Sequence, residues 1–269
     1  MSGRVLSRYT VLMVALMLGS VAVAAGLNYF PVLGDTVALW AADLGSVAVV
    51  GLAAAIVVGT AYCFGKGQPG RLYWMLVGVG AAMYALGDLV WSIYELAGNE
   101  VPYPGLPDAF YLAEYVFLTA GLAYAAWSYR SLGDIKMPLA LSGAVGAAAA
   151  GGLYVWFLNP LVLSDPEIAA GEKALGVAYP AFDVFLAFMP AVLIILMVSR
   201  LGWGRFGWPW WAVAVGVLFI AASDTAYAWL AAVDRYESGM ILDYGWMLGH
   251  VAIATGALLA RDVTRVPRA

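Results

Sequence analysis

Long apolar segments alternate with short polar links along the whole chain. Each segment has about the 20 residues that an α-helix needs to cross a bilayer. The links, such as FGKGQPG and NEVPYPG, contain the glycines and prolines that are typical of turns. The pattern therefore predicts an all-α membrane protein with eight transmembrane helices embedded in a lipid bilayer. Their expected ranges are 9–27, 42–64, 72–94, 108–129, 137–158, 176–199, 209–232 and 242–261.

The composition agrees with this pattern and narrows the chemistry. The 269 residues are 64% hydrophobic and only 11% charged. Cys63 and His250 are the only residues of their types, which excludes a disulfide framework and a cysteine metal cluster. The sequence contains no GxSxG, HExxH or P-loop motif and no basic groove for nucleic acid. It predicts a non-enzymatic protein without a nucleic-acid partner, and it identifies no cofactor.

The basic residues gather on one side of the predicted helices. Lys173 and Arg235 are the exceptions. Because short cytoplasmic loops carry an excess of lysine and arginine, we expect both termini in the cytoplasm and the protein in the cell membrane. The first segment also has features of a secretory signal, but its counterpart later in the chain favours a helix. The basic residues on the expected cytoplasmic side are Arg4, Arg8, Lys66, Arg71, Arg130, Lys136, Arg200, Arg205, Arg261, Arg265 and Arg268.

The second half of the chain resembles the first. MYALGDLVWSIYEL and PDAFYLAEYVFLTAGL can be aligned with FIAASDTAYAWLAA and LDYGWMLGHVAIATGAL. The similarity predicts two four-helix repeats, 1–133 and 134–269, with the same orientation and a pseudo-two-fold axis along the membrane normal. The alignment places Asp88 on Asp224, Trp91 on Tyr227, Asp108 on Asp243, Tyr111 on Trp246, Tyr115 on His250 and Gly121 on Gly256.

Ionisable residues lie within the predicted helices, near their outer ends. Such residues are costly in a bilayer, usually face the bundle interior and often mark a functional site. Their spacing, together with that of the neighbouring aromatic residues, forms stripes on the third, fourth, seventh and eighth segments. We therefore expect an outward-facing acidic and aromatic pocket between the two halves. Its candidate ligand-binding residues are Asp88, Asp224, Asp108, Asp243, Trp91, Tyr227, Tyr111, Trp246 and His250.

Several of the acidic residues also have structural interpretations. Asp108 and Asp243 begin helices, where a carboxylate caps free backbone N–H groups. Asp43 and Asp183 are expected near the starts of the second and sixth helices, where capping is again an alternative. Asp88 and Asp224 lie mid-helix, so their structural alternative is a hydrogen bond that joins helices.

Other residues have open alternatives too. His250 is either a satisfied core histidine or a metal ligand. Glu114 is expected to point away from the stripe that starts at Asp108, and its repeat counterpart is Gly249. Four tryptophans are expected to form an interfacial belt on the cytoplasmic side. They are Trp203, Trp208, Trp210 and Trp211.

One motif resembles a known group of membrane regions. GDLVWSIYEL is followed by PxPxxxDxFYLxxY, and the later segments AYPAFDVFLAF and LDYGWMLGH are similar to the matching second-half motifs. Together they resemble the multi-helix N-terminal sensory region of bacterial and archaeal signalling proteins, notably GGDEF-type diguanylate cyclases and sensor histidine kinases. The second motif is formed by Pro102, Pro104, Asp108, Phe110, Tyr111, Leu112 and Tyr115.

The resemblance implies a membrane sensory module. Only DVTRVPRA follows Arg261, so we expect a separate signalling partner to supply the output. An acidic and aromatic pocket would suit a small cationic ligand, an amine or a metal ion. The sequence therefore predicts a ligand-binding sensor, with a small-solute or proton-coupled transporter and a structural subunit of a membrane complex as the alternatives.

Overall fold

The computed structural model describes residues 6–30, 32–233 and 235–265, and this part of the chain is helical. Arg4 and Arg268, which belong to the charge pattern, lie outside the described residues. The helices are α1 (Arg8–Tyr29), α2 (Asp35–Ala61), α3 (Pro69–Leu96), α4 (Leu106–Tyr129), the short η1 (Arg130–Leu132), α5 (Lys136–Leu153), η2 (Tyr154–Leu163), α6 (Ala170–Leu201), α7 (Trp208–Ala232) and α8 (Ile241–Arg265).

Seven spans, with α5 and η2 together forming one of them, are long and apolar enough to cross a membrane. They indicate a multi-pass helical membrane protein. Among the described long helices, α8 does not meet this standard; it is long enough, with 25 residues, but not apolar enough. Its sequence includes Asp243, His250 and Asp262, and all three are buried against neighbouring helices.

Two helices begin much earlier than their hydropathy predicted, α2 at Asp35 rather than 42 and α6 at Ala170 rather than 176. Gly34 adopts φ 94°, a left-handed conformation that suits glycine, and α2 starts at the next residue. Asp43 consequently lies inside α2, and Asp183 lies inside α6. The alternative that these two aspartates cap helices is therefore wrong, because backbone N–H groups are unsatisfied only in the first turn.

The helix that begins as α5 does not end at residue 158 as predicted. It continues as a π-helix, η2, through Pro160 to Leu163. Proline has no N–H to donate and crowds the preceding turn, so a wider turn accommodates it. The hydrogen bond from the Ser164 N–H to the Asn159 carbonyl, 3.0 Å long, has the i→i+5 spacing of such a turn.

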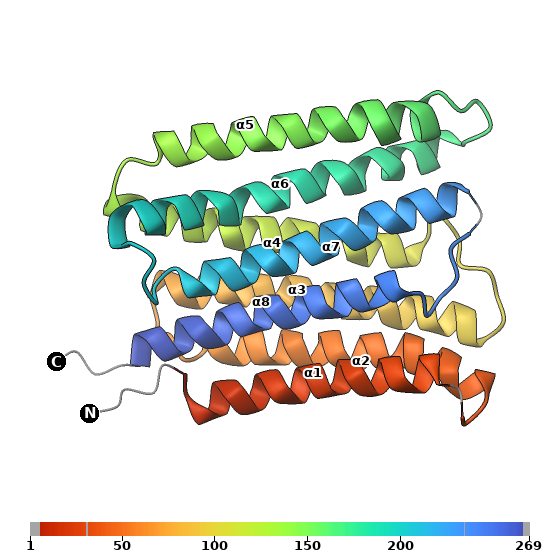
Figure 1. Ribbon diagram of the computed structural model, residues 1–269, viewed down its shortest axis with the longest axis horizontal. Helices are drawn as coiled ribbons and strands as arrows, with labels where there is room; N and C mark the ends of the chain where they lie inside the picture. The colour runs from red at the N-terminus through yellow and green to blue at the C-terminus, as the bar shows by residue number, and fades with distance from the viewer. Residues whose placement is uncertain (1–5, 31, 234, 266–269) are drawn as a thin grey trace.

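Six helices form a closed ring in the order α2, α3, α4, α6, α7 and α8, each packed against the next (Figure 1). The remaining two long helices, α1 and α5, lie outside the ring at opposite edges of the molecule. α1 packs against both α2 and α8, whereas α5 packs mainly against α6. Hydrogen bonds hold α1 at both ends, from the Ser7 N–H to Asp262 (2.8 Å) and from the Asn28 amide to the Gly239 carbonyl (2.7 Å).

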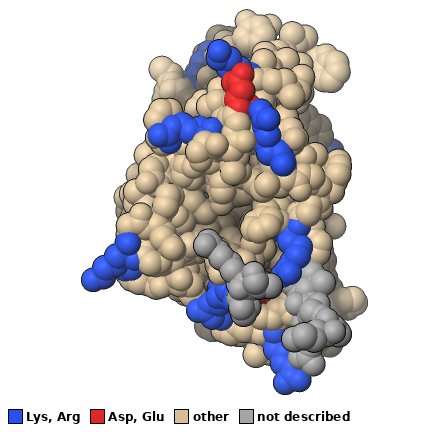
Figure 2. Space-filling model, turned by 90° about the vertical axis from the view of Figure 1, so that its left-hand side faces the viewer, with Lys and Arg blue, Asp and Glu red and all other residues tan. Residues whose placement is uncertain are grey.

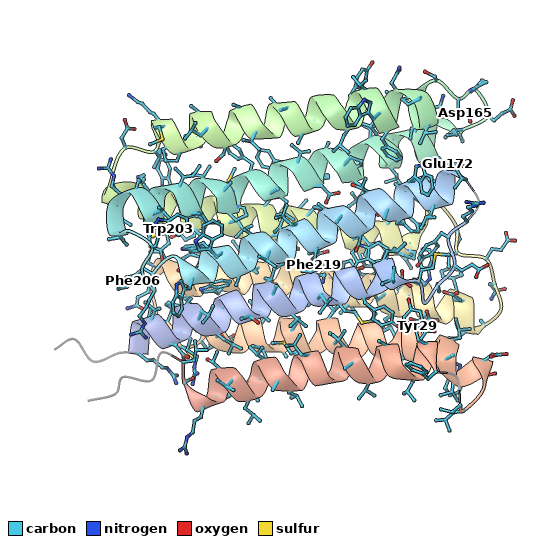
Figure 3. All side chains as sticks on the ribbon, viewed as in Figure 1. Tyr29, Asp165, Glu172, Trp203, Phe206 and Phe219 are labelled. Atoms are coloured by element: carbon cyan, nitrogen blue, oxygen red, sulfur yellow. The ribbon has the colours of Figure 1, made fainter. Side chains whose placement is uncertain are left out.

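The two ends of the ring differ in charge. We call the end where α1 starts the basic end, and Figure 2 shows lysine and arginine side chains spread over it. The opposite end, where α1 finishes, is the acidic end, and Asp165 and Glu172 lie there (Figure 3).

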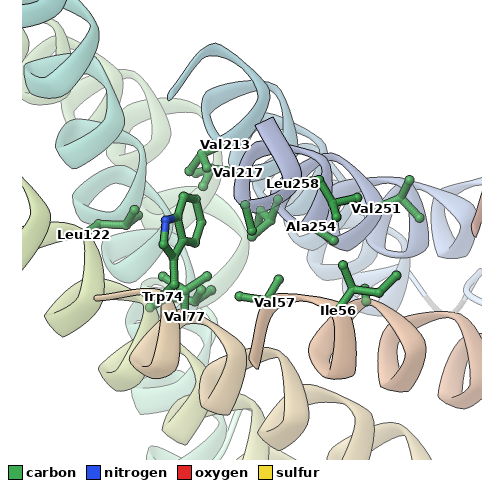
Figure 4. Close-up of a cluster of buried hydrophobic side chains, with 14 of the residues drawn as sticks. Ile56, Val57, Trp74, Val77, Leu122, Val213, Val217, Val251, Ala254 and Leu258 are labelled. Carbon is green, nitrogen blue, oxygen red and sulfur yellow. The ribbon is translucent and has the colours of Figure 1, made fainter. Parts of the chain in front are cut away.

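An apolar core fills the ring toward the basic end. Trp74 of α3 and Trp210 of α7 are almost fully buried, and their rings stack with centroids 5.7 Å apart and planes 5° from parallel. Side chains from α2, α4 and α8 belong to the same apolar cluster as this pair, and Figure 4 shows part of that cluster around Trp74. The expected place of Trp210 in an interfacial belt is therefore wrong, while Trp203, Trp208 and Trp211 are exposed near the basic end.

Candidate functional site

A cavity of about 440 Å³ occupies the half of the ring nearer the acidic end. Its volume is in the range of pockets that bind small molecules. All six ring helices contribute to its wall. The sequence-predicted residues on the wall are Asp88, Asp224, Asp108, Asp243, Trp91, Tyr227, Tyr111 and Trp246; the ninth, His250, lies behind it.

The wall of this cavity is strongly acidic. Among the described residues, no lysine or arginine lines it. Buried charges need a partner because their transfer from water is costly. The negative potential of such a wall attracts cations and repels anions. The carboxylates that line the cavity are Asp43, Asp88, Asp108, Glu114, Asp165, Glu172, Asp224 and Asp243.

Asp88 connects three helices near the middle of the wall. The Ser46 hydroxyl of α2 donates a hydrogen bond to its Oδ2 (2.5 Å), and the Tyr111 hydroxyl of α4 donates to its Oδ1 (3.0 Å). Asp88 is only 8% exposed. These bonds orient the carboxylate and leave further lone pairs on its oxygens for a ligand.

Asp224 has a matching environment in the second half. Trp246 of α8 donates its indole N–H to Oδ1 (2.7 Å), as Tyr111 of α4 does to Asp88. The Tyr115 hydroxyl lies within hydrogen-bonding distance of both Asp224 and Asp183. Because a tyrosine hydroxyl has one hydrogen to donate, the two carboxylates compete for it.

Asp108 and Asp243 cap their helices, as one of the two interpretations predicted. Asp108 accepts the Gly105 N–H (2.7 Å), and Asp243 accepts the Gly239 N–H (2.6 Å). Each also accepts a tyrosine hydroxyl, from Tyr179 (2.7 Å) or Tyr236 (3.2 Å) respectively. Both still line the cavity, so capping and a position on the cavity wall occur together.

Glu114 differs most from its expected position. It lines the same cavity as Asp108 instead of pointing away from it, and its Oε1 lies 2.7 Å from His250 Nε2. The other ring nitrogen of His250 hydrogen-bonds the Trp246 carbonyl at 2.8 Å. Protein atoms thus occupy both nitrogens of this buried histidine, which favours a satisfied core residue over a metal ligand.

Aromatic rings form one side of the cavity near its mouth. The Tyr227 ring meets Trp91 (centroids 6.3 Å apart), Tyr236 (4.7 Å) and Trp246 (5.9 Å). The planes of the first two pairs are 77° and 80° apart, respectively. Glu95 lies at the rim, where its Oε2 accepts hydrogen bonds from Trp91 and Ser238, both 2.7 Å long. Ring faces beside carboxylates are a favourable environment for an organic cation.

Asp43 lies on the wall, although it is not among the candidate ligand-binding residues predicted from the sequence. It is 7% exposed, and no described group hydrogen-bonds its Oδ2. A buried acceptor without a partner costs free energy, so this oxygen suits a donor supplied by a ligand. Gly34 followed by Asp35 is the sequence feature that marks the start of α2 and would have placed Asp43 inside the helix.

Two tyrosines in the loops at the acidic end have raised pKa values, mainly because they are buried. Tyr103, between α3 and α4, is partly buried next to Asp108 and Glu172; burial and these charges raise its pKa to about 12. Burial and the charge of Asp243 likewise raise the pKa of Tyr236, between α7 and α8. Both hydroxyls therefore keep their protons at neutral pH and can donate hydrogen bonds.

Among the described residues, no group of three or more histidine, cysteine, aspartate or glutamate side chains is arranged to hold a metal ion. The carboxylates are instead spread around the wall. No protein family, curated protein or solved structure matches this chain.

Proposed function

We propose that this protein is a membrane sensor that binds a small organic cation in the acidic cavity. One observation carries the proposal: eight carboxylates and no described lysine or arginine line a cavity in which the Asp43 Oδ2 has no partner. The ligand would supply the missing positive charge and hydrogen-bond donor. The aromatic side of the cavity favours an organic cation over a metal ion, because ring faces attract ammonium groups.

The proposal includes two four-helix repeats, 1–133 and 134–269, about a pseudo-two-fold axis. Two contacts support it: Trp74 touches Trp210, and Trp91 touches Tyr227. Each pair joins residues 136 positions apart, the same spacing as Asp88 and Asp224. Residues that contact their own counterparts lie next to a two-fold axis, so the axis would run between α3 and α7.

The orientation is part of the proposal as well. With eight spans, the basic end would face the cytoplasm and hold both termini, and the cavity would open outside the cell membrane. A ligand between the repeats would favour one of their relative packings and shift the population toward it. A separate signalling partner at the basic end would then detect that change.

A transporter is the second candidate, because a site between repeats is typical of carriers. The stacked Trp74 and Trp210 and the surrounding core close the ring on the basic side of the cavity, however. The π-helix η2 also has no counterpart in α1, which is helical from Arg8 to Tyr29. These features support a sensor over a carrier with a pair of broken helices.

The proposal can be tested by a thermal-shift screen of the purified protein with amine metabolites, polyamines and divalent metals. We expect a monovalent amine to raise the melting temperature. Replacing Asp88→Asn together with Asp224→Asn is expected to abolish that shift, because both central carboxylates lose their charge. The ligand-free melting temperature should stay within a few degrees of the wild-type value.

The matched control is Glu100→Gln with Glu167→Gln, which changes the same number of charges at exposed loop positions away from the cavity wall and should preserve most of the shift. If the central double variant does not fold, the carboxylates are structural and a subunit of a membrane complex becomes the better interpretation. Uptake of the stabilising amine into proteoliposomes would favour the carrier instead.

A further inference from the structure

The cavity has two chemically different parts. The polar chamber contains Asp43, Asp88 and Asp224 and is bounded by α2, α3, α4, α7 and α8. The apolar branch lies between η2, α6 and α7 and is lined by Phe157, Leu161, Val162, Gly176 and Ala228. Asp165, just after η2, and Glu172 of α6 line the cavity at the outer end of the branch. A ligand that fills the whole cavity therefore needs a polar part and an apolar part.

The branch exists because the ring is asymmetric. α6 and α7 pack less closely against each other than α2 and α3, the corresponding pair in the first half. η2 occupies the space beside α6 and α7, where its residues form a separate small apolar cluster with Val177 and Ala228. Phe157 and Val162 are only 7% exposed, whereas Trp156 on the other face of η2 is 83% exposed. One face of η2 thus lines the branch, and the other faces outward from the ring.

The chamber has a place for N–H donors. The Asp43 Oδ2 lacks a partner, and Asp88 beside it on the wall is oriented by Ser46 and Tyr111. A primary or secondary ammonium group supplies both a positive charge and N–H donors. A quaternary ammonium has the charge but no N–H, so it would leave the Asp43 oxygen unsatisfied.

We infer that the ligand is an amphipathic amine, with a protonated amino group at Asp43 in the polar chamber and a hydrocarbon or aryl tail in the apolar branch. This inference rests on the proposed function and specifies its ligand. Only η2 separates the branch from the outer surface of the helices. In a bilayer that surface would contact lipid, into which hydrocarbon tails partition.

The test uses the full chain in phosphatidylcholine nanodiscs and the straight-chain series from methylammonium to octylammonium, with dissociation constants from titration calorimetry. We expect the affinity to rise by about fourfold for each added methylene until the branch is full. Ala228→Phe should remove this gain for the longer amines and leave methylammonium binding unchanged. Partitioning into the bilayer is the same for wild type and variant, so it cancels in their ratio.

Matched variants separate the branch from general effects. Ala222→Phe adds the same ring at an exposed position of α7 and should leave the series unchanged. Gly176→Ala is a milder branch variant, since its Cβ would lie 3.0 Å from a Val162 methyl carbon, and should weaken octylammonium more than methylammonium. It keeps the test decisive if Ala228→Phe does not fold.

The head group is tested by charge and by N–H count. Asp43→Asn should weaken every amine at least tenfold, whereas Asp35→Asn at the exposed start of the same helix should not. Octyltrimethylammonium should bind at least tenfold more weakly than octylammonium. Equal affinities for these two ligands would overturn the inference while the proposed function stands. The same holds if the affinity still rises with chain length in both Ala228→Phe and Gly176→Ala. If no member of the series binds the wild type, both fail.

Discussion

At the residue scale, the buried contact between Glu114 and His250 has a large expected effect on stability. It joins α4 to α8 across the ring, and the two side chains are 3% and 0% exposed. A buried polar group that loses its partner keeps its desolvation cost. The pair therefore holds α4 and α8 together and fixes the Glu114 side chain on the cavity wall.

Removing one member should be more damaging than removing both. Glu114→Ala is expected to lower the free energy of unfolding by about 3 kcal/mol, because it leaves His250 buried without its partner. Glu114→Leu with His250→Leu should recover most of that loss. Equilibrium unfolding in mixed micelles would measure both, with Glu100→Ala in the exposed loop as the control. An unchanged stability of Glu114→Ala would contradict this role.

At the element scale, glycines set how closely helices approach within each half. A Cβ on Gly80 of α3 would lie 3.1 Å from the Glu114 carbonyl oxygen of α4. A Cβ on Gly216 of α7 would lie 2.5 Å from the Gly249 carbonyl oxygen of α8. Small residues allow membrane helices to pack closely. The two helix pairs thus use glycines at matching positions to bring their carboxylates to the same wall.

Gly216→Ala should therefore destabilise the protein by about 1–3 kcal/mol, because the added methyl group meets backbone atoms that cannot move aside. Gly51→Ala in α2 is the control, since no heavy atom outside its own helix lies within 4 Å of a Cβ there. That change should stabilise the protein by about 0.5–1 kcal/mol, as alanine favours a helix more than glycine does. Equal effects of the two changes would argue against close packing at Gly216.

At the scale of the whole molecule, the charge difference between the two ends sets the expected orientation. Cys63 provides a direct probe, because it is exposed just beyond the basic end of α2 and is the sole cysteine in the sequence. The side of the membrane on which Cys63 lies shows which way the cavity opens. That orientation in turn shows from which side the proposed ligand would enter.

We expect Cys63 in intact cells to resist a membrane-impermeant maleimide and to react once the cells are permeabilised. In a Cys63→Ser background, Glu100→Cys in the exposed loop at the acidic end should react without permeabilisation. Gel-shift detection of the modified protein measures both. Labelling of Cys63 in intact cells would reverse the orientation and turn the cavity toward the cytoplasm.

Several features follow from the sequence by itself. The lengths of the apolar segments predict the helices because membrane thickness sets a local requirement that each segment meets alone. Residue periodicity likewise places Asp88, Trp91, Tyr111 and Trp246 on faces that line the cavity. The capping of Asp108 and Asp243 is also local, since the partner N–H groups lie three or four residues away.

Other features depend on which helices become neighbours. Three features depend on contacts between helices that are distant in the sequence. They are the contact of Glu114 with His250, the unpaired oxygen of Asp43 and the stacking of Trp74 on Trp210. No local pattern specifies these contacts, because an apolar helix can pack against many partners with similar free energy in a bilayer. Only the packing of all six ring helices decides where a buried charge meets a partner and where a cavity remains.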